Sequence, residues 1–448
     1  MRTLLRALVD QREWQTYDVF RLHFERAASE LAEIENNPGL ANLSVSDSTY
    51  QRWYYGSGRP HPGSRRVLRH LFGYSVDELW AAESVPVCPA DEVSASHTEH
   101  WAGPGTDDLN EMGRSAAMAA RRAMAFAMGA ERGEVGPETL GFLQDQVRRI
   151  AETYVRVPLG TILDDLVDVQ DETFRLLESG RTKPSQARDL YLLAALASGM
   201  LAKAGHDLGD PSSAMMQART AAVCADKAEH KGMGTWVRGL QSLISYWAER
   251  PEDALHYARQ GAAMGEGLRG SVSVWLAGLE ARAAALLGDE DIVRAASERA
   301  SDLRDQVIPD DLDALGGLLV FPQIRQDYYV VEAEVLIGDG DSQLTERAER
   351  VVHGYSDISD PHWAFSDAAG AQTSLALARL HHGDLEGTAE AMRPVLDLPA
   401  NRRNAGIIYS AERVREALLR GPVRNALAAR EIREEIAMFR RPTLALPR

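Results

Sequence analysis

Near residue 50, four polar side chains share one side of an expected helix, and their types can hydrogen-bond to the edges of DNA bases. They lie in the stretch SVSDSTYQRWYYGSGRP, residues 44–60, on one side of an expected helix: Asp47, Ser48, Gln51 and Arg52. An arginine guanidinium can donate two hydrogen bonds to guanine, and an aspartate carboxylate can accept one from the amino group of cytosine. Each such contact contributes about 1–3 kcal/mol of discrimination between bases. The pattern is therefore compatible with direct contact to a major groove.

The sequence also predicts where this helix begins and ends. Ser46 precedes it and can cap its first turn, because a serine hydroxyl accepts hydrogen bonds from the free amides there. The helix is expected to run to about Tyr55, and Gly56 ends it. Its other side carries three apolar residues at helical spacing that we expect in a core: Val45, Tyr50 and Trp53. Residues 63–80, GSRRVLRHLFGYSVDELW, predict another amphipathic helix and a short closing one.

Charge is divided unevenly along the chain. The 448 residues carry a formal net charge of −17. Residues 1–75 hold ten Arg against eight Asp and Glu, so the rest of the chain carries −19. DNA is a polyanion, and most of this chain would repel it, whereas the N-terminal part would tolerate it. This asymmetry favours a division of labour between the two parts.

Three segments with different patterns follow one another. Residues 1–80 contain short helical patterns broken by turn signals. Residues 81–106 are rich in Pro, Ser, Gly and acidic residues without a period, which predicts a linker. Residues 107–440 have helical spacing almost throughout and hardly any strand alternation. The sequence therefore predicts an all-α protein.

The long helical segment has an internal period of about 38–50 residues between turn signals. These are Gly209-Asp210, Arg250-Pro251, Gly288-Asp289, Gly338-Asp339, Gly383-Asp384 and Gly421-Pro422. A Gly-Asp pair can supply both a tight turn and the cap of the next helix, and alanines let paired helices approach closely. Two such helices cannot bury an apolar face alone, so neighbouring pairs must stack. We expect a helical-hairpin solenoid; an irregular helical bundle is the alternative.

The first of these segments resembles a known class of DNA-binding domain. The pattern Val45-Ser46-x-Ser48-Thr49-x-x-Arg52-Trp53-x-x-Gly56-x-x-x-Pro60, followed by Leu68, Leu71-Phe72-Gly73 and Val76-Asp77-Glu78-Leu79, resembles Xre-type helix-turn-helix regulators. The remainder resembles an actinobacterial group that joins such a domain to tetratricopeptide-like repeats. The segments Tyr154-Val155-Arg156-Val157-Pro158 and Asp207-Leu208-Gly209-Asp210 share this resemblance. It implies a helix-turn-helix domain at 1–80, a linker at 81–106 and a tetratricopeptide-like helical repeat domain at 107–440.

The resemblance also implies roles for single residues. Asp47, Ser48 and Arg52 stand where such domains reach base edges, with Gln51 beside them. Ser46 and Arg59 would contact phosphates and fix the register on the duplex. The sequence departs from the usual pattern at residues 36–43, NNPGLANL, which make a longer turn before the recognition helix. A helical protein-interaction domain without DNA contact is the alternative.

The repeats offer a second candidate site. Stacked hairpins line a concave face with their first helices, and such faces bind peptides or small molecules. Polar and aromatic residues of these helices and their loops are candidates for effector contact: Trp236, Arg238, Arg325, Gln326, Tyr329 and Arg402. Packing in the core is the alternative role for the aromatic ones. The charge of −19 outside residues 1–75 favours a cationic or basic-peptide effector.

Other signals are weak. Gly265-x-Gly267-x-x-Gly270 resembles a dinucleotide fingerprint but follows no strand, so a plain turn is expected. His97 and His100, like Asp339 and Asp341, lack further ligands for a metal site. We therefore expect no metal, no cofactor and no enzyme activity. Two cysteines are too few for a disulfide framework, which favours a cytoplasmic protein, and no apolar run predicts a membrane span.

Together these features predict a DNA-binding transcriptional regulator. Its partners would be a double-stranded DNA operator, a peptide or small-molecule effector and a second copy of itself in a homodimer. A repeat scaffold that binds proteins and does not bind DNA is the alternative function.

Overall fold

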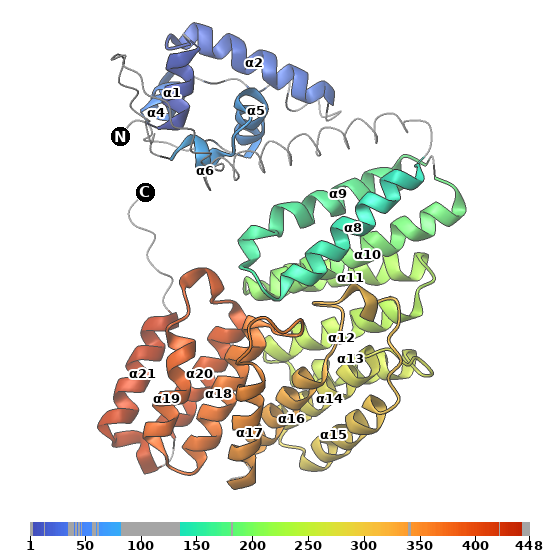
Figure 1. The fold of residues 1–448 in the computed structure, drawn as a ribbon, viewed down its shortest axis with the longest axis vertical. Coiled ribbons are helices and arrows are strands. Elements are labelled where there is room, and N and C mark those ends of the chain that lie inside the picture. The colour runs from blue at the N-terminus through green and yellow to red at the C-terminus, as the bar shows by residue number, and fades with distance from the viewer. Residues whose placement is uncertain are drawn as a thin grey trace, which may run out of the picture. The chain divides into compact units, whose positions relative to one another are not determined.

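The computed structural model describes residues 3–12, 14–34, 40, 43, 45, 47–55, 60, 62–81, 135–180, 182–338, 342–420 and 422–440 (Figure 1). Over these ranges the protein is all-α and contains no β-strand. The chain divides into two compact units, Met1–Gly103 and Pro104–Arg448. Apart from residue 81, the expected linker at 81–106 lies outside the described residues, as do His97, His100, Asp339 and Asp341. No helix in the described part is long and apolar enough to cross a bilayer.

The N-terminal unit is built from short helices around one apolar core. They are α1 (Leu4–Gln11), α2 (Tyr17–Ile34), α4 (Asp47–Tyr54), α5 (Pro62–Phe72) and α6 (Val76–Leu79). The helix expected to start after Ser46 is therefore confirmed as α4, and the pair expected after Pro60 is confirmed as α5 and α6. Ser75 and Glu78 form a reciprocal cap at the start of α6, which fixes this closing turn.

The apolar side of α4 is fixed by the core, as the sequence predicts. Tyr50 and Trp53 of α4 are 1% and 3% exposed, and Val45, just before the helix, is 2% exposed. The Tyr50 hydroxyl donates to the backbone carbonyl of Gln15 at 2.8 Å, and the Trp53 ring lies 6.0 Å from that of Phe24 on α2. Burial of both aromatic residues therefore sets which side of α4 faces outward.

The C-terminal unit consists of helices packed in consecutive pairs. The helices α8 (Pro137–Tyr154) and α9 (Leu163–Glu178) come first. The pairs that follow are α10 (Pro184–Asp207) with α11 (Pro211–Lys227), α12 (Lys231–Trp247) with α13 (Pro251–Met264), α14 (Val272–Leu287) with α15 (Glu290–Arg304), α16 (Gln323–Ile337) with α17 (Ser342–Gly354), α18 (Phe365–His381) with α19 (Leu385–Leu396), and α20 (Ala405–Leu419) with α21 (Leu427–Arg440). The short 3-10 turns η1 (Leu159–Thr161), η2 (Asp313–Leu315), η3 (Ala400–Arg402) and η4 (Pro422–Asn425) lie between helices.

The turns within these pairs follow the chemistry expected of Gly-Asp. Gly209, Gly288 and Gly383 have φ of +79°, +72° and +75°, a left-handed conformation that favours glycine. The carboxylates of the next residues cap the following helices, with distances of 3.0 Å to the amide of Ser213, 3.1 Å to that of Ile292 and 2.8 Å to that of Gly387. The stretch 265–270 is a turn between α13 and α14 without a preceding strand, as expected.

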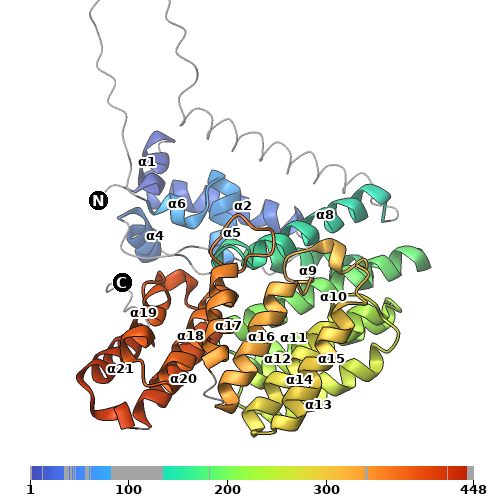
Figure 2. The same cartoon turned by 60° about the horizontal axis from the view of Figure 1, so that its bottom comes forward.

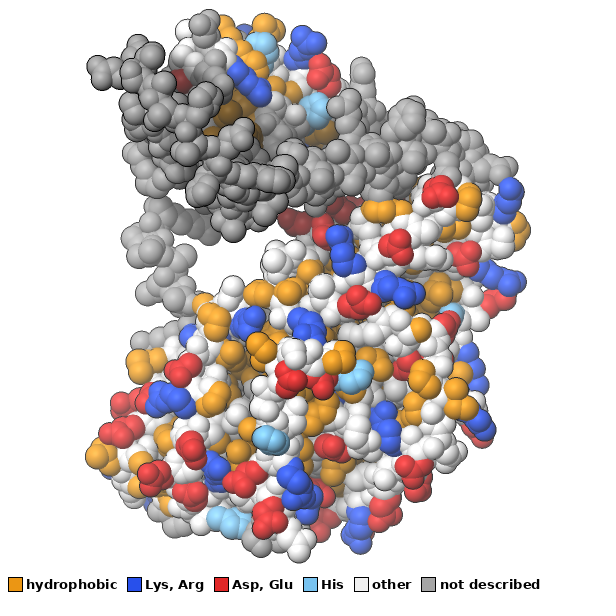
Figure 3. Space-filling model, in the orientation of Figure 1, with side chains coloured by type: hydrophobic (Ala, Val, Ile, Leu, Met, Phe, Trp, Pro, Cys, Tyr) orange, Lys and Arg blue, Asp and Glu red, His pale blue; other side chains and the backbone are white. Residues whose placement is uncertain are grey.

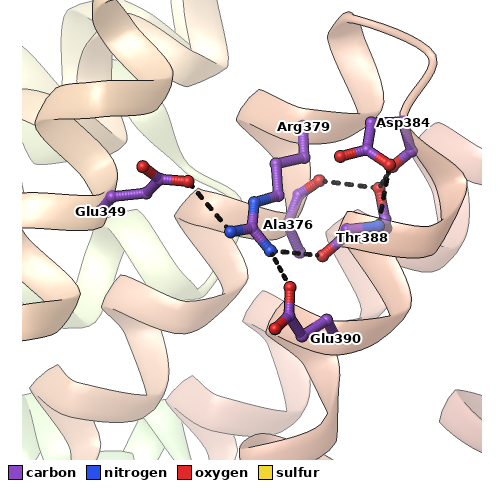
Figure 4. Close-up of polar contacts among 7 residues, drawn as sticks. Glu349, Ala376, Arg379, Asp384, Thr388 and Glu390 are labelled. Atoms are coloured by element: carbon purple, nitrogen blue, oxygen red, sulfur yellow. Dashed lines mark hydrogen bonds and ion pairs between the residues drawn. The ribbon is translucent and has the colours of Figure 1, made fainter.

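The turn between α18 and α19 shows how side chains reinforce a pair (Figure 4). Asp384 caps α19, and the Thr388 hydroxyl donates to the backbone carbonyl of Asp384 at 2.6 Å. Arg379 of α18 reaches Glu390 of α19 at 2.9 Å and Glu349 of the preceding α17 at 3.0 Å. One guanidinium thus connects three helices, although exposed pairs of this kind stabilise only modestly.

The first helices of the pairs form a curved inner row. Each of α10, α12, α14, α16, α18 and α20 contacts the next, and α20 also contacts α10. Figures 1 and 2 both show α16 to α18 between α12–α15 and α19–α21. The row therefore curves until its last helix meets its first. Figure 3 shows acidic and basic side chains interspersed over one face of this unit, without one large patch of either sign.

Candidate functional site

The inner row of helices surrounds a cavity of about 550 Å³. This volume is typical of sites that hold a small molecule. Side chains of α12, α14 and α16 form its apolar wall, among them Trp236, Leu240, Leu243, Val272, Trp275 and Tyr329. Trp236 and Trp275 lie side by side with ring centroids 5.8 Å apart. The wall is thus mostly aromatic and aliphatic.

Three loops from distant parts of the sequence cover this wall. They are residues 155–161, 318–321 and 400–404. The amide of Leu318 donates to the carbonyl of Ala151 at 3.0 Å, and the amide of Phe365 donates to that of Val155 at 3.2 Å. Gly317 has φ of +50°, and a Cβ there would collide with the backbone carbonyl of Ala151. The close approach of the chain before loop 318–321 to α8 therefore depends on glycine.

One polar cluster in the cavity is centred on Asp207 at the end of α10. Its carboxylate accepts hydrogen bonds from the Tyr154 hydroxyl at 2.9 Å and from the Lys203 ammonium at 2.5 Å. Asn404, the cap of α20, donates to the same carboxylate at 3.3 Å. Burial and the neighbouring Asp207 raise the pKa of Tyr154 well above its usual value, so this hydroxyl remains a donor. The cluster joins α8, α10 and α20 at the cavity.

A second polar cluster pairs Arg325 with Asp367. The guanidinium lies 2.5 Å from the carboxylate and also donates to the carbonyl of Val320 at 3.2 Å. Burial opposes the charged form of Arg325, but Asp367 outweighs it and the pKa of the guanidinium is raised. Both side chains line the cavity. Their charges therefore neutralise each other within it.

Two further arginines line the cavity without a carboxylate partner among the described residues. Arg402 lies partly buried on η3 with its guanidinium 5.9 Å from the centroid of the Phe365 ring. Arg403 donates to the backbone carbonyl of Leu398 at 2.8 Å. The lining thus contains four basic residues and two acidic ones: Lys203, Arg325, Arg402 and Arg403 against Asp207 and Asp367.

A buried charge cluster lies beside the cavity wall. Arg282 of α14 is 1% exposed and pairs with Glu332 of α16 at 2.7 Å, while Arg413 of α20 reaches the same carboxylate at 3.1 Å. The Arg282 guanidinium also lies 4.2 Å from the ring centroids of Tyr246 and Tyr329. Burial opposes ionisation of Glu332, but Arg282 and Arg413 outweigh it and lower its pKa. This cluster connects α12, α14, α16 and α20.

The structure brings together four of the six residues proposed for effector contact. Trp236, Arg325, Tyr329 and Arg402 line the cavity. Arg238 and Gln326 do not, because successive residues point about 100° apart around a helix. Arg238 donates to Gln241 at 2.8 Å, and Gln326 accepts from Arg304 at the same distance. Whether the four lining residues contact an effector stays a prediction.

Sequence reasoning missed several residues of this site. Lys203, Asp207 and Asn404 were not proposed, nor were Arg282 and Glu332. Asp207 belongs to the segment 207–210, for which the sequence indicates only the family resemblance. A signal for Arg282 and Glu332 was present, since each is one of two charged residues in a largely apolar stretch of helix, EARAAALL and YVVEAEVLI. Charged residues in such surroundings are usually paired when buried.

The residues proposed for DNA contact are placed in part. Gln51 and Arg52 are exposed on α4, and the Arg52 guanidinium donates to the Thr49 hydroxyl at 3.3 Å. Asp47 and Ser48 lie in the first turn of α4, but their side chains are outside the described set. Ser46 and Arg59 also lie outside it.

The two tyrosines that follow Trp53 have different environments. The Tyr54 hydroxyl donates to Asp10 of α1 at 2.6 Å, which raises its pKa together with burial. Tyr55 is 59% exposed and packs edge-on against Tyr54. The aromatic run is therefore not a single stacking surface. Tyr54 instead attaches α4 to α1.

Compared with protein-family models and with curated protein sequences, the chain matches none. Within the described residues, no three His, Cys, Asp or Glu side chains are grouped so that they could hold a metal ion. Cys224 is buried and unpaired, and burial raises the pKa of its thiol.

Proposed function

We propose that this protein is a DNA-binding transcriptional regulator whose helical repeats bind an effector. Residues 1–80 would be a helix-turn-helix domain and residues 107–440 a tetratricopeptide-like helical-hairpin solenoid. The DNA-binding part is supported by α4, whose apolar side is held in the core while Gln51 and Arg52 face outward. An exposed polar side of a core-anchored helix is what major-groove recognition requires.

The cavity is the observation that carries the effector-binding part of the proposal. It has a small-molecule volume, an apolar wall and a few convergent polar groups, the combination expected of a ligand site. Its cover consists of loops 155–161, 318–321 and 400–404, which come from three places in the chain. A ligand held between them would favour one arrangement of these loops and so shift the population of states.

Regulation would follow from dimer geometry. Regulators of this kind bind two half-sites as a symmetric dimer, so the spacing of two recognition helices decides operator affinity. We propose a homodimer in the cytoplasm in which the effector alters this spacing. A second copy of the chain and a double-stranded operator are then its partners.

Binding of the full chain to random-sequence and genomic duplex DNA at several salt concentrations tests this function. We expect binding that weakens steeply as salt rises, because phosphate contacts release counterions. Arg52→Ala should lower affinity for preferred sequences by roughly tenfold or more, the loss expected for one bidentate base contact. Arg238→Ala, in the C-terminal unit, is the matched control and should bind DNA as the unchanged chain does.

Two results would contradict the DNA-binding part. One is no salt-sensitive binding to any duplex. The other is unchanged affinity and sequence preference in both Arg52→Ala and Asp47→Ala. Either result would favour the alternative function, a repeat scaffold that binds other proteins.

A further inference from the structure

We infer that the cavity binds an organic acid: a small molecule with an apolar, ring-sized body and one anionic group held at Arg402. This inference rests on the proposed effector function and specifies the ligand class. It also differs from the cationic effector that the charge of the chain favours. The contacts of the lining residues carry it.

The residues of the cavity wall indicate the shape and polarity of the ligand's uncharged part. Trp236, Trp275 and Tyr329 line the cavity together with aliphatic side chains. Aromatic walls of this kind pack well against flat apolar groups, with ring separations of about 4.5–7 Å. A volume of about 550 Å³ suits a molecule of one or two ring systems.

The charged residues of the lining indicate which sign of charge a ligand should carry. Asp207 is occupied by Lys203, and Asp367 by Arg325. Both carboxylates are therefore already neutralised. Arg402 lines the same cavity and has no carboxylate partner among the described residues. A ligand carboxylate would supply the charge-assisted partner that Arg402 lacks.

A cationic ligand fits less well for the same reason. It would have to displace Lys203 from Asp207 or Arg325 from Asp367, and the side chains of both pairs are 16% exposed or less. Removing one partner of a buried pair leaves an uncompensated charge, which is strongly unfavourable. The −19 outside residues 1–75 acts weakly here, because charges beyond about 8–10 Å are screened by salt.

A peptide is also disfavoured. Each buried peptide residue brings one N–H and one C=O that need hydrogen-bond partners. In this cavity the Tyr154 hydroxyl and the Lys203 ammonium both donate to Asp207, and the wall from α12, α14 and α16 is mostly apolar. A small molecule with a single charged end makes fewer such demands.

Two fluorescent probes that differ by one anionic group test this inference. The first is 1-anilinonaphthalene-8-sulfonate, and the second is N-phenyl-1-naphthylamine, which has the same rings without the sulfonate. Titration of the full chain with each probe gives its dissociation constant. Arg402→Met should weaken sulfonate binding roughly tenfold, as expected for a lost charge-assisted contact. It should change binding of the neutral probe less than about twofold.

Two control variants locate the effect. Arg238→Met removes an arginine of α12 that lies outside the cavity lining, so both probes should bind as to the unchanged chain. Ser366→Trp fills the cavity from its partly exposed edge, and it should abolish binding of both probes. Circular dichroism of each variant verifies that it is folded.

Two outcomes would overturn the inference and differ in what they leave standing. If Ser366→Trp abolishes both probes but Arg402→Met changes both equally or neither, the cavity binds ligands but the acid class is wrong. If neither probe binds, or if Ser366→Trp changes nothing, the cavity is not a ligand site. Duplex binding by the unchanged chain, measured in parallel, shows separately whether the DNA-binding part holds.

Discussion

The buried charges of Glu332 and Arg282 in the C-terminal unit are each stabilised by several side chains. Glu332 is shared by Arg282 and Arg413, and it also accepts a hydrogen bond from the Tyr246 hydroxyl at 3.0 Å. Arg282 is enclosed by two tyrosine rings, which face the guanidinium with their negative π-faces. Such a cluster stabilises the fold only while it is complete, because each member is buried.

Glu332→Gln tests the importance of this cluster. The substitution keeps the shape of the side chain but leaves two arginines without their carboxylate. We expect the free energy of unfolding to fall by roughly 3 kcal/mol, the lower end of the cost of breaking a buried pair. Urea unfolding followed by circular dichroism measures it.

An exposed pair provides the control for this variant. Asp291 and Arg294 lie 2.7 Å apart with side chains 92% and 66% exposed. Asp291→Asn should change the free energy of unfolding by less than about 0.5 kcal/mol. Equal effects of the two substitutions would show that the Glu332 cluster stabilises the fold no more than an exposed ion pair does.

Buried His206 makes the stability of the folded chain depend on pH. Burial lowers its pKa to about 4, and the nearby Lys203 adds to the shift while Asp207 opposes it. The unfolded chain binds a proton near pH 6.5 while the folded chain does not. Stability should therefore be full above pH 6.5 and should fall by up to about 1.4 kcal/mol per pH unit below it.

His206→Gln should flatten that slope between pH 6.5 and 4.5. Unfolding midpoints in urea across this range measure the change. His256→Gln replaces an exposed histidine of α13 and should leave the slope as it is. An unchanged slope in His206→Gln would mean that His206 is protonated in the folded chain.

Helix turns were the most predictable elements of the fold. Gly-Asp pairs marked the turns after α10, α14 and α18, and in each the glycine has positive φ and the aspartate caps the next helix. These features are local, so a short sequence determines them. The start and core side of α4 were predictable for the same reason.

The cavity was much less predictable. Its loops at 155–161, 318–321 and 400–404 have no period, and their contact depends on the curvature of the whole inner row. Arg238 and Gln326 were predicted to contact an effector from their residue type alone. Residue type does not determine which side of a helix faces the cavity. The apolar surroundings of Arg282 indicate that it needs a charged partner if it is buried. The alanines around it allow almost any side of α14 to be buried, so the pattern does not predict which side faces the core.

Glu249 departs from the turn chemistry seen at Gly209, Gly288 and Gly383. It follows α12 with φ of +57°, where a side chain is strained. Glu249→Gly should raise the free energy of unfolding by about 1 kcal/mol, the cost of a left-handed non-glycine residue. The converse change is Gly288→Ala, at φ of +72° with open space around its Cβ position.

Gly288→Ala should lower stability by a similar amount, about 1 kcal/mol, since backbone strain is its main effect. Thermal unfolding of Glu249→Gly and Gly288→Ala measures how each substitution changes the unfolding midpoint. If both shift the midpoint in the same direction, the strain at these turns does not decide their stability.

The two units of the chain carry different chemistry. The N-terminal unit presents an exposed polar side of α4, while the C-terminal unit encloses a ligand-sized cavity with spare positive charge. Asp207 and Asn404 join the first and last helices of the inner row beside that cavity. A ligand there would contact both ends of the row at once, which suits a site that changes the curvature of the array.

Genome-wide recovery of DNA bound by the tagged full chain tests whether α4 reads a DNA sequence. We predict that the recovered fragments share one palindromic sequence, because a symmetric dimer reads two half-sites. The Arg52→Ala chain, expressed at the same level, should lose that enrichment. Fragments without a common sequence, or the same set recovered with Arg52→Ala, would contradict the proposal that α4 reads DNA.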